Sequence, residues 1–173
     1  MDDSNLETLA EAIQSGRDGI AVPEDLVEER PPERQGPGRN LAAEIQGMSV
    51  GQRLKLALKG NRDARMILIR DASRLVQRFV LLNPRIGEEE VVALAKNRSI
   101  DRELLEQICR RKEWMGNYQV KLALATNPKT PQAIAMRLVP TLLPRDLRAL
   151  AKSKNVPSVV NGMAKRLIIE RGG

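Results

Sequence analysis

The chain has 173 residues, a formal net charge of +7, no histidine and a single cysteine, Cys109. This composition excludes Cys/His zinc sites, a Ser-His-Asp triad and a disulfide within the chain. Aromatic residues make up only 2% of the chain, so the core must be built from aliphatic side chains and methionine, which favours packed helices over a β-sandwich.

The first 40 residues differ from the rest in charge. They contain ten acidic and four basic side chains, whereas residues 41–173 carry a net charge of +13. Apolar residues at helical spacing predict a short helix over residues 4–14. Residues 15–40 are rich in proline, glycine and charge, which predicts a disordered linker. We therefore expect an acidic, mostly disordered tail over residues 1–40 and a basic helical domain over residues 41–173.

The N-terminus predicts neither export nor membrane insertion. Its sequence "MDDSNLETLAEAIQSG" is acidic where a secretory signal is basic and then apolar. No apolar run in the chain approaches the roughly 18 residues that a membrane span needs. We expect a cytoplasmic protein.

The helical region begins near Leu41 or Ser49. Ser49 and Gln52 match a capping box and predict a helix of about ten residues. Gly60 and Asn61 tolerate a left-handed backbone and are expected to close this helix.

Similar signals recur further along the chain. Asp71 can cap a second helix, which Asn83-Pro84 ends because proline disfavours helical geometry in the residue before it. Further helices are predicted over residues 87–96, 101–112 and 117–126, and with a proline in the first turn at Pro131, Pro144 and Pro157. We expect about nine short helices and no strand.

Fragments of the sequence repeat. "LKLALKGN" at 54–61 and "VLLNPRI" at 80–86 match parts of "VKLALATNPKTPQAIAMRL" at 120–138, and "LAKNRSI" at 94–100 matches "LAKSKNV" at 150–156. The fragment at 80–86 lies 44 residues before its match, and the fragment at 94–100 lies 56 residues before its match. The two offsets differ by the length of one short helix, which predicts an insertion around residues 132–143. Short helix pairs that repeat in this way bury their apolar faces by stacking on neighbours. The pattern predicts an irregular, α-solenoid-like helical-repeat array.

These phrases resemble the HEAT-like and variant leucine-rich helical repeats of bacteria. They are also similar to a widespread group of uncharacterised bacterial proteins that share the ending "DLRALAKSKNVP". The resemblance spans roughly residues 49–170. It implies a structural repeat and carries no catalytic residue.

Several residues are expected to shape the joints between repeats rather than to bind a ligand. An Asn-Pro pair ends a helix and reverses the chain. The expected joint residues are Asn83, Pro84, Trp114, Asn127, Pro128 and Pro131.

The acidic and thiol groups predict no catalytic or metal site. Glu88, Glu89 and Glu90 are consecutive, so on a helix they point about 100° apart, and acids in a first turn suit the helix dipole. Cys109 lies on an apolar helix face and is expected to be a small buried hydrophobe.

Two interpretations are open for Trp114 and Tyr118. They are four residues apart and share a face if one helix continues through Gly116, with Arg110 over the indole. Such a pair could form a base-stacking platform or anchor a joint between repeats.

Basic residues are the feature in excess. Cations near helix C-termini complement the helix dipole, but the charge of residues 41–173 exceeds that need. A basic surface attracts phosphates or an acidic partner. The candidate basic face comprises Arg70, Arg74, Arg78, Lys96, Arg98, Arg110, Arg111, Lys112, Lys152 and Lys154.

The sequence therefore predicts a non-catalytic interaction or scaffold module without a cofactor. Its expected partner is a protein, acidic in character, bound through the basic face. The alternative is a nucleic-acid-binding protein that uses the same face for phosphates. The acidic tail is expected either to screen the basic face or to act only as a solubilising segment.

Overall fold

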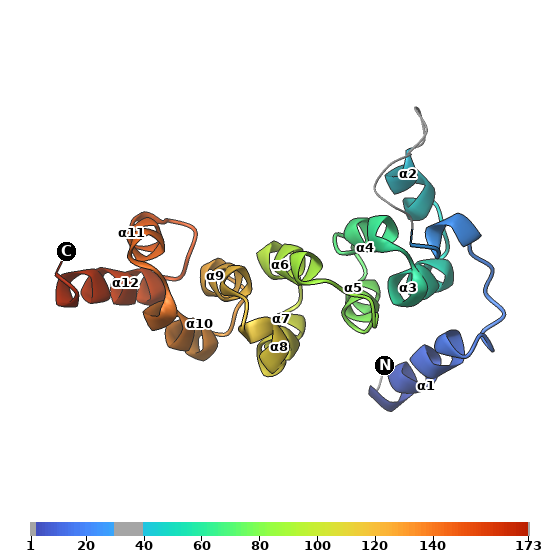
Figure 1. Cartoon of the computed structure of the whole chain (residues 1–173), viewed down its shortest axis with the longest axis horizontal. Helices are drawn as coiled ribbons and strands as arrows, with labels where there is room; N and C mark the ends of the chain where they lie inside the picture. Colours follow the sequence, from blue (N-terminus) through green and yellow to red (C-terminus); the bar gives the residue numbers. More distant parts are fainter. Residues whose placement is uncertain (1–2, 30–39, 173) are drawn as a thin grey trace. The chain divides into compact units, whose positions relative to one another are not determined.

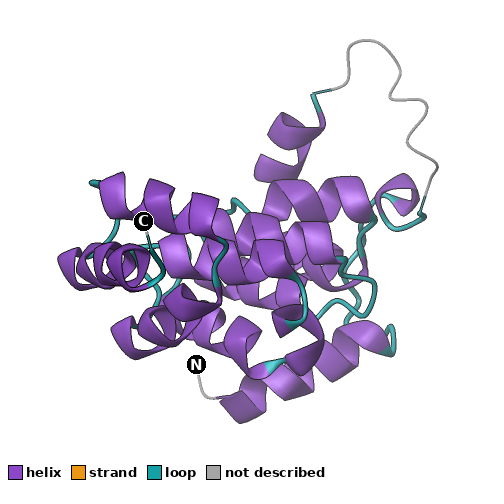
Figure 2. Cartoon of the chain, turned by 60° about the vertical axis from the view of Figure 1, so that its left-hand side comes forward, coloured by secondary structure: helices purple, strands orange, loops and turns teal. Residues whose placement is uncertain are grey.

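The computed structural model of the protein describes residues 3–29 and 40–172. These residues contain twelve α-helices, two 3-10 helices and no strand (Figures 1 and 2). The all-helical prediction is confirmed, although eleven of the helices lie beyond residue 40, where the sequence predicts about nine. None of the described helices has both the length and the apolar character to span a membrane.

The chain divides into two compact units, Met1–Glu90 and Val91–Gly173, which we call unit 1 and unit 2. The boundary falls within α6 (Glu88–Lys96). Before α6, unit 1 contains α1 (Asp3–Gln14), η1 (Glu24–Leu26), α2 (Leu41–Gln46), α3 (Val50–Lys59), α4 (Arg62–Leu68) and α5 (Arg74–Leu81). After α6, unit 2 contains α7 (Arg102–Arg110), α8 (Lys112–Met115), α9 (Tyr118–Thr126), α10 (Gln132–Leu138), η2 (Val139–Thr141), α11 (Pro144–Lys152) and α12 (Ser158–Glu170). The repeat arrangement and the division at residue 40 stay predictions.

Each unit has an aliphatic core of its own. In unit 1, α3 packs against α1, α4 and α5, and the only phenylalanine, Phe79, is fully buried. In unit 2, α12 packs against α10, η2 and α11, and α9 packs against α8 and α10. Leu105, Ile108, Leu124 and Val160 are fully buried there. Burial of such side chains stabilises each unit by about 1.5–3 kcal/mol per residue.

The capping box at the start of α3 is present, but the predicted end of this helix needs correction. Gln52 Oε1 accepts from the Ser49 backbone N–H, and Ser49 Oγ accepts from that of Gln52. Gly60 has φ −64° and Asn61 has φ −68°, so neither is left-handed. Asn61 instead caps the start of α4, because its Oδ1 accepts from the Ala64 N–H at 3.0 Å.

Gly60 is required for a different reason than the predicted one. A Cβ atom there would lie 2.2 Å from the carbonyl oxygen of Leu56, so the chain between α3 and α4 leaves no room for a side chain. Gly60 and Asn61 alone connect α3 to α4, a helix that the sequence pattern did not predict.

Two further helix starts differ from the prediction. Asp71 does not cap α5 directly: its Oδ1 accepts from the Ser73 N–H, and Ser73 is the residue before the helix. Pro144 occupies the first turn of α11 as predicted, whereas Pro131 and Pro157 each precede their helix by one residue.

Residues 15–29 have defined positions on unit 1, which corrects the predicted disorder of this segment. Leu6 and Ile13 of α1 are buried, and α1 packs against α3. After α1, Oδ1 of Asp18 lies 2.9 Å from Nζ of Lys55 in α3. The segment has few apolar residues of its own, but α3 supplies the surface on which it packs. The rest of the predicted linker, residues 30–39, lies outside the described residues.

A buried arginine, Arg65, contacts residues 15–29 at a second point, Glu29. Arg65 of α4 is only 2% exposed, and its Nε and a terminal nitrogen donate to the two carboxylate oxygens of Glu90 at 2.7 and 3.0 Å. The other terminal nitrogen donates to Glu29 Oε1 at 2.7 Å and to the Gly60 carbonyl at 2.9 Å. Glu90 is therefore a buried ion-pair partner, not simply an acid that suits a helix dipole.

Truncation of a fully buried leucine in α9 should destabilise the protein. Leu124 is 0% exposed and Leu122 is half-buried. Leu124→Ala should lower the free energy of unfolding by about 2–5 kcal/mol, and Leu122→Ala should lower it clearly less. Urea denaturation of the two variants measures the difference, and an equal or reversed order would contradict the assigned helix face.

The Asp18 carboxyl group should make stability depend on pH. The hydrogen bond from Lys55 lowers the Asp18 pKa, burial opposes this, and the Ile20 N–H adds to the lowering. A carboxyl with a lower pKa in the folded state stabilises the fold above its unfolded pKa, and this contribution is lost as the pH falls below about 4. The free energy of unfolding should fall more steeply between pH 6 and pH 3 for the wild type than for Asp18→Asn. Equal slopes would argue against the ion pair.

Candidate functional site

The net charge of the chain is divided unequally between the two units. Unit 1 contains 13 basic and 16 acidic residues, whereas unit 2 contains 16 basic and 6 acidic residues, a net charge of +10. Three members of the candidate basic face, Arg70, Arg74 and Arg78, belong to unit 1, and the other seven belong to unit 2. These three arginines recur at every fourth position, but Arg70 follows the end of α4 whereas Arg74 and Arg78 belong to α5, so they do not share one helix.

Cations in unit 1 are engaged with acids of the same unit. Asp71 lies 3.0 Å from Nε of Arg53, and Lys55 and Arg65 pair with Asp18 and Glu29 as described above. Glu29 also lies 3.7 Å from Arg85. Asp18 and Glu29, two acids that precede residue 30, thus contact cations outside the candidate basic face.

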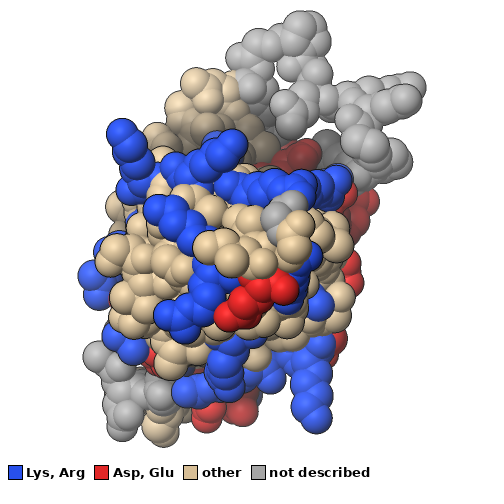
Figure 3. Space-filling model, turned by 90° about the vertical axis from the view of Figure 1, so that its left-hand side faces the viewer, with Lys and Arg blue, Asp and Glu red and all other residues tan. Residues whose placement is uncertain are grey.

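Unit 2 contains many more cations than its own acids could neutralise. Its 16 basic side chains exceed its six acidic ones by ten. The imbalance is largest over residues 121–173, which contain ten basic residues and only Asp146 and Glu170 as acids. On the face drawn in Figure 3, which includes the side where Figure 1 places α11 and α12, Lys and Arg side chains are widespread and Asp and Glu are few.

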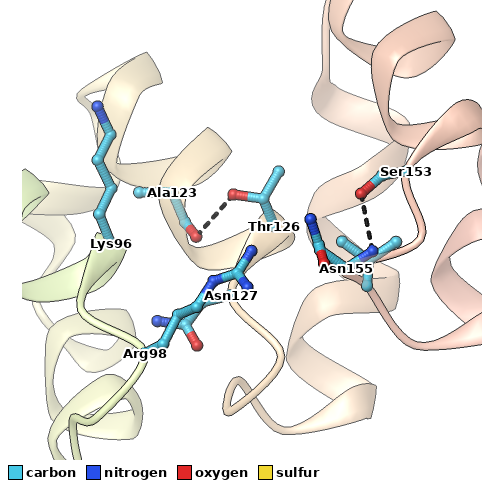
Figure 4. A pocket seen from close by; sticks show the side chains of 8 residues that line it. Lys96, Arg98, Ala123, Thr126, Asn127, Ser153 and Asn155 are labelled. Carbon is cyan, nitrogen blue, oxygen red and sulfur yellow. Dashed lines mark hydrogen bonds between the residues drawn. The ribbon is translucent and has the colours of Figure 1, made fainter.

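A polar hollow of about 250 Å³ lies in unit 2 at the C-terminal ends of three helices, α6, α9 and α11 (Figure 4). Lys96 and Arg98 line it from the α6 side, Thr126 and Asn127 from the end of α9, and the loop after α11 from the other side. Its lining residues are Lys96, Arg98, Ala123, Thr126, Asn127, Ser153, Asn155 and Val156. Residues from both of the matching segments, "LAKNRSI" at 94–100 and "LAKSKNV" at 150–156, therefore line the hollow.

Asn127 fixes the α6 end of this hollow. Its buried side-chain amide donates to the carbonyl oxygens of Ala95 at 2.7 Å and Asn97 at 3.0 Å, and its Oδ1 accepts from the Lys129 N–H. Pro128 follows as an exposed residue and Pro131 is buried immediately before α10. The last carbonyls of a helix have no partner within it, so the Asn127 amide satisfies the Ala95 carbonyl, which would otherwise be buried without a hydrogen bond.

Asn83 has the same geometry in unit 1. Its amide donates to the Ala57 carbonyl of α3 at 3.0 Å, and its Oδ1 accepts from the Arg85 N–H at 2.9 Å. Pro84 follows and is exposed. Both asparagines thus connect the end of one helix to the end of an earlier one.

Asn161 has a related function at the end of α11, which sequence reasoning missed. Its amide donates to the carbonyls of Leu150, Ala151 and Ser153 at 3.1, 2.7 and 3.2 Å. Asn161 is only eight residues beyond Ser153 and lies inside α12, so no Asn-Pro pair marked it.

Four cations border the hollow or adjoin its lining residues. Lys96, Arg98, Lys152 and Lys154 are all exposed. No ion pair joins any of them to another residue in the described part of the chain. Because asparagine amides already occupy the nearby helix-end carbonyls, these cations are not needed to satisfy those carbonyls.

The aromatic residues do not form a stacking platform. Trp114 is only 5% exposed, and α8 ends at Met115, so Tyr118 belongs to the next helix. The guanidinium over the indole is that of Arg111, 4.5 Å from the ring centroid, rather than that of Arg110. The Tyr118 hydroxyl accepts from the Leu143 N–H and donates to Asp146, which ties α9 to the start of α11. Arg110 and Lys112 are exposed.

Cys109 is half-buried, and burial raises the pKa of its thiol to about 11. The thiol therefore stays protonated near neutral pH, and the thiolate needed for nucleophilic attack is scarce. No three acidic or cysteine side chains come together as metal ligands in the portion that the structure describes.

Loss of the Asn127 amide should leave the buried Ala95 carbonyl without a partner, whereas the half-buried Asn97 carbonyl keeps the Ile100 N–H at 3.4 Å. Asn127→Ala should lower the free energy of unfolding by about 1–3 kcal/mol, the penalty for an unsatisfied buried group. Asn155→Ala, which changes an exposed residue of the same hollow, should have little effect. Thermal and urea denaturation compare the two variants. Equal stability would show that the amide bonds are not important.

No family model, curated protein or solved structure matches the chain. The all-helical fold is what the structure establishes, and the resemblance to HEAT-like repeats stays a prediction from the sequence pattern.

Proposed function

We propose that the protein is a non-catalytic interaction module that binds an acidic protein partner through the exposed cations of unit 2. The observation that carries this proposal is the charge imbalance of that unit, a net +10. Lys96, Arg98, Lys152 and Lys154 add to it because they are exposed and have no ion-pair partner among the described residues.

The contrast with unit 1 supports the proposal. Carboxylates pair with buried or half-buried cations there, and those pairs organise the fold. Surface cations without counter-charges repel one another, which costs stability in the isolated protein. An acidic partner removes that repulsion and is also attracted over a distance, which raises the rate of association.

Nucleic acid is the second candidate partner. The ten basic and two acidic residues of positions 121–173 favour it, because phosphate contacts provide most of the affinity in nonspecific nucleic-acid binding. The burial of Trp114 weighs against it for single strands, which bind largely by stacking on exposed aromatic rings.

The proposal predicts salt-sensitive binding to an acidic peptide. The full chain should bind a labelled 20-residue polyglutamate, measured by fluorescence anisotropy, and should bind more weakly as the Debye length falls from about 10 Å at 0.1 M salt to about 3 Å at 1 M. Lys152→Gln with Lys154→Gln should weaken binding more than Arg17→Gln with Arg62→Gln, two exposed cations of unit 1 outside the candidate basic face.

Three results would contradict the proposal that unit 2 binds an acidic protein partner. The first is no binding of polyglutamate at low salt. The second is an equal loss of affinity in both double variants. The third is preferential binding of a 20-nucleotide single strand over the peptide, which would favour the second candidate.

A further inference from the structure

We infer that the hollow at the ends of α6, α9 and α11 is a carboxylate-binding site that takes an aspartate or glutamate side chain of an acidic peptide segment. Lys96 and Arg98 are its main contacts. The inference rests on the proposed function and deepens it, because it assigns the acidic partner to one site rather than to the whole basic surface.

The lining of the hollow has the chemistry that a carboxylate needs. A guanidinium such as that of Arg98 can donate two parallel hydrogen bonds to one carboxylate, and Lys96 adds a second positive charge. On the opposite side, Ser153 Oγ accepts from the Asn155 N–H at 3.2 Å, so its own hydroxyl hydrogen can point to a ligand (Figure 4). The apolar atoms of Ala123 and Val156 suit the methylene groups of a glutamate.

Lys96 and Lys152 end α6 and α11, where a cation suits the helix dipole, but no cation at this site is needed to satisfy the carbonyls that accept from asparagine. The helix-end carbonyls of α6 accept from Asn127, and those of α11 accept from Asn161. In the absence of such amides, lysine and arginine often cap a helix C-terminus. With the carbonyls satisfied, Lys96 and Arg98 are available for an external anion.

The arrangement suits an extended segment with several acids. Lys152 and Lys154 flank Ser153, which lines the hollow opposite Arg98, so cations adjoin both of its sides. An anion in the hollow reduces the repulsion between these charges, and neighbouring acids of the same peptide reach the flanking lysines. Several cations and hydroxyl donors around one hollow bind an anion more tightly than a single surface charge.

The test compares two double variants of the full chain that remove the same charge from unit 2. Lys96→Gln with Arg98→Gln changes the hollow, and Lys165→Gln with Arg166→Gln changes exposed residues of α12 outside its lining. The probe is a fluorescein-labelled decaglutamate at 0.1 M salt. The hollow variant should bind about tenfold more weakly than the wild type, as expected for loss of charge-assisted hydrogen bonds, and the α12 variant less than about threefold more weakly.

A third variant tests the shape of the site without a change in charge. Asn155 is exposed and lines the hollow, so Asn155→Trp should fill the space and weaken decaglutamate binding as well. Melting curves by circular dichroism establish that each variant keeps the wild-type fold.

The possible results distinguish failure of the proposed site from failure of the proposed function. If the wild type fails to bind decaglutamate, the proposed function is overturned together with the site. If the wild type binds but the hollow and α12 variants lose affinity equally, the site is overturned and the interaction module stands. If a ten-nucleotide strand binds more tightly than the peptide and depends on Lys96 and Arg98, the ligand is a nucleic-acid phosphate, and the assignment to an acidic peptide is overturned.

Discussion

The side-chain amides of asparagine, buried at Asn83 and Asn127 and half-buried at Asn161, are the interaction on which the packing of these short helices depends. Every helix leaves its last carbonyl groups without partners inside the helix, and a chain of many short helices has many such ends. Asn83, Asn127 and Asn161 each donate to carbonyls at the end of an earlier helix. The burial of helix ends would otherwise cost about 1–3 kcal/mol for each unsatisfied group. The amides therefore permit close packing at the ends of the helices.

The same bonds shape the candidate site. Because Asn127 and Asn161 satisfy the carbonyl groups, the loops after α6 and α11 can present lysine and arginine outward. Unit 1 has a further structural contact besides the Asn83 amide, the buried Arg65 between Glu90 and Glu29. A buried ion pair of this kind is a structural contact, since loss of one partner would leave a charge buried without compensation. Unit 1 thus uses its charges for folding, and unit 2 has a large excess of exposed ones.

The sequence predicted features that depend on neighbours along the chain. The capping box of Ser49 and Gln52, the helix over residues 4–14 and the chain reversal after Asn83 and Asn127 all follow from local hydrogen bonding and from the geometry before proline. The excess of basic residues was also visible from composition, as was the use of aliphatic residues for the core.

Features that depend on distant partners were missed. Glu90 looked like an ordinary acid of a first helical turn because Arg65, its partner, lies 25 residues earlier. Residues 15–29 looked unable to fold because Lys55 and the surface of α3 were not part of the local pattern. The sequence pattern predicts Asn61 at the end of one helix, whereas Asn61 caps the start of the next, since the left-handed turn that would close α3 does not form. The hollow itself requires residues up to 60 positions apart, from Lys96 to Val156, to meet at three helix ends.

Hydrogen exchange of the full chain, with and without decaglutamate, tests the central claim most directly, namely that an acidic partner is bound at the ends of α6, α9 and α11. The account predicts slower amide exchange in peptides that cover residues 94–100, 123–130 and 150–158 when the probe is present, with unchanged exchange over residues 41–86. Protection that falls on residues 41–86, or that spreads evenly over both units, would contradict it.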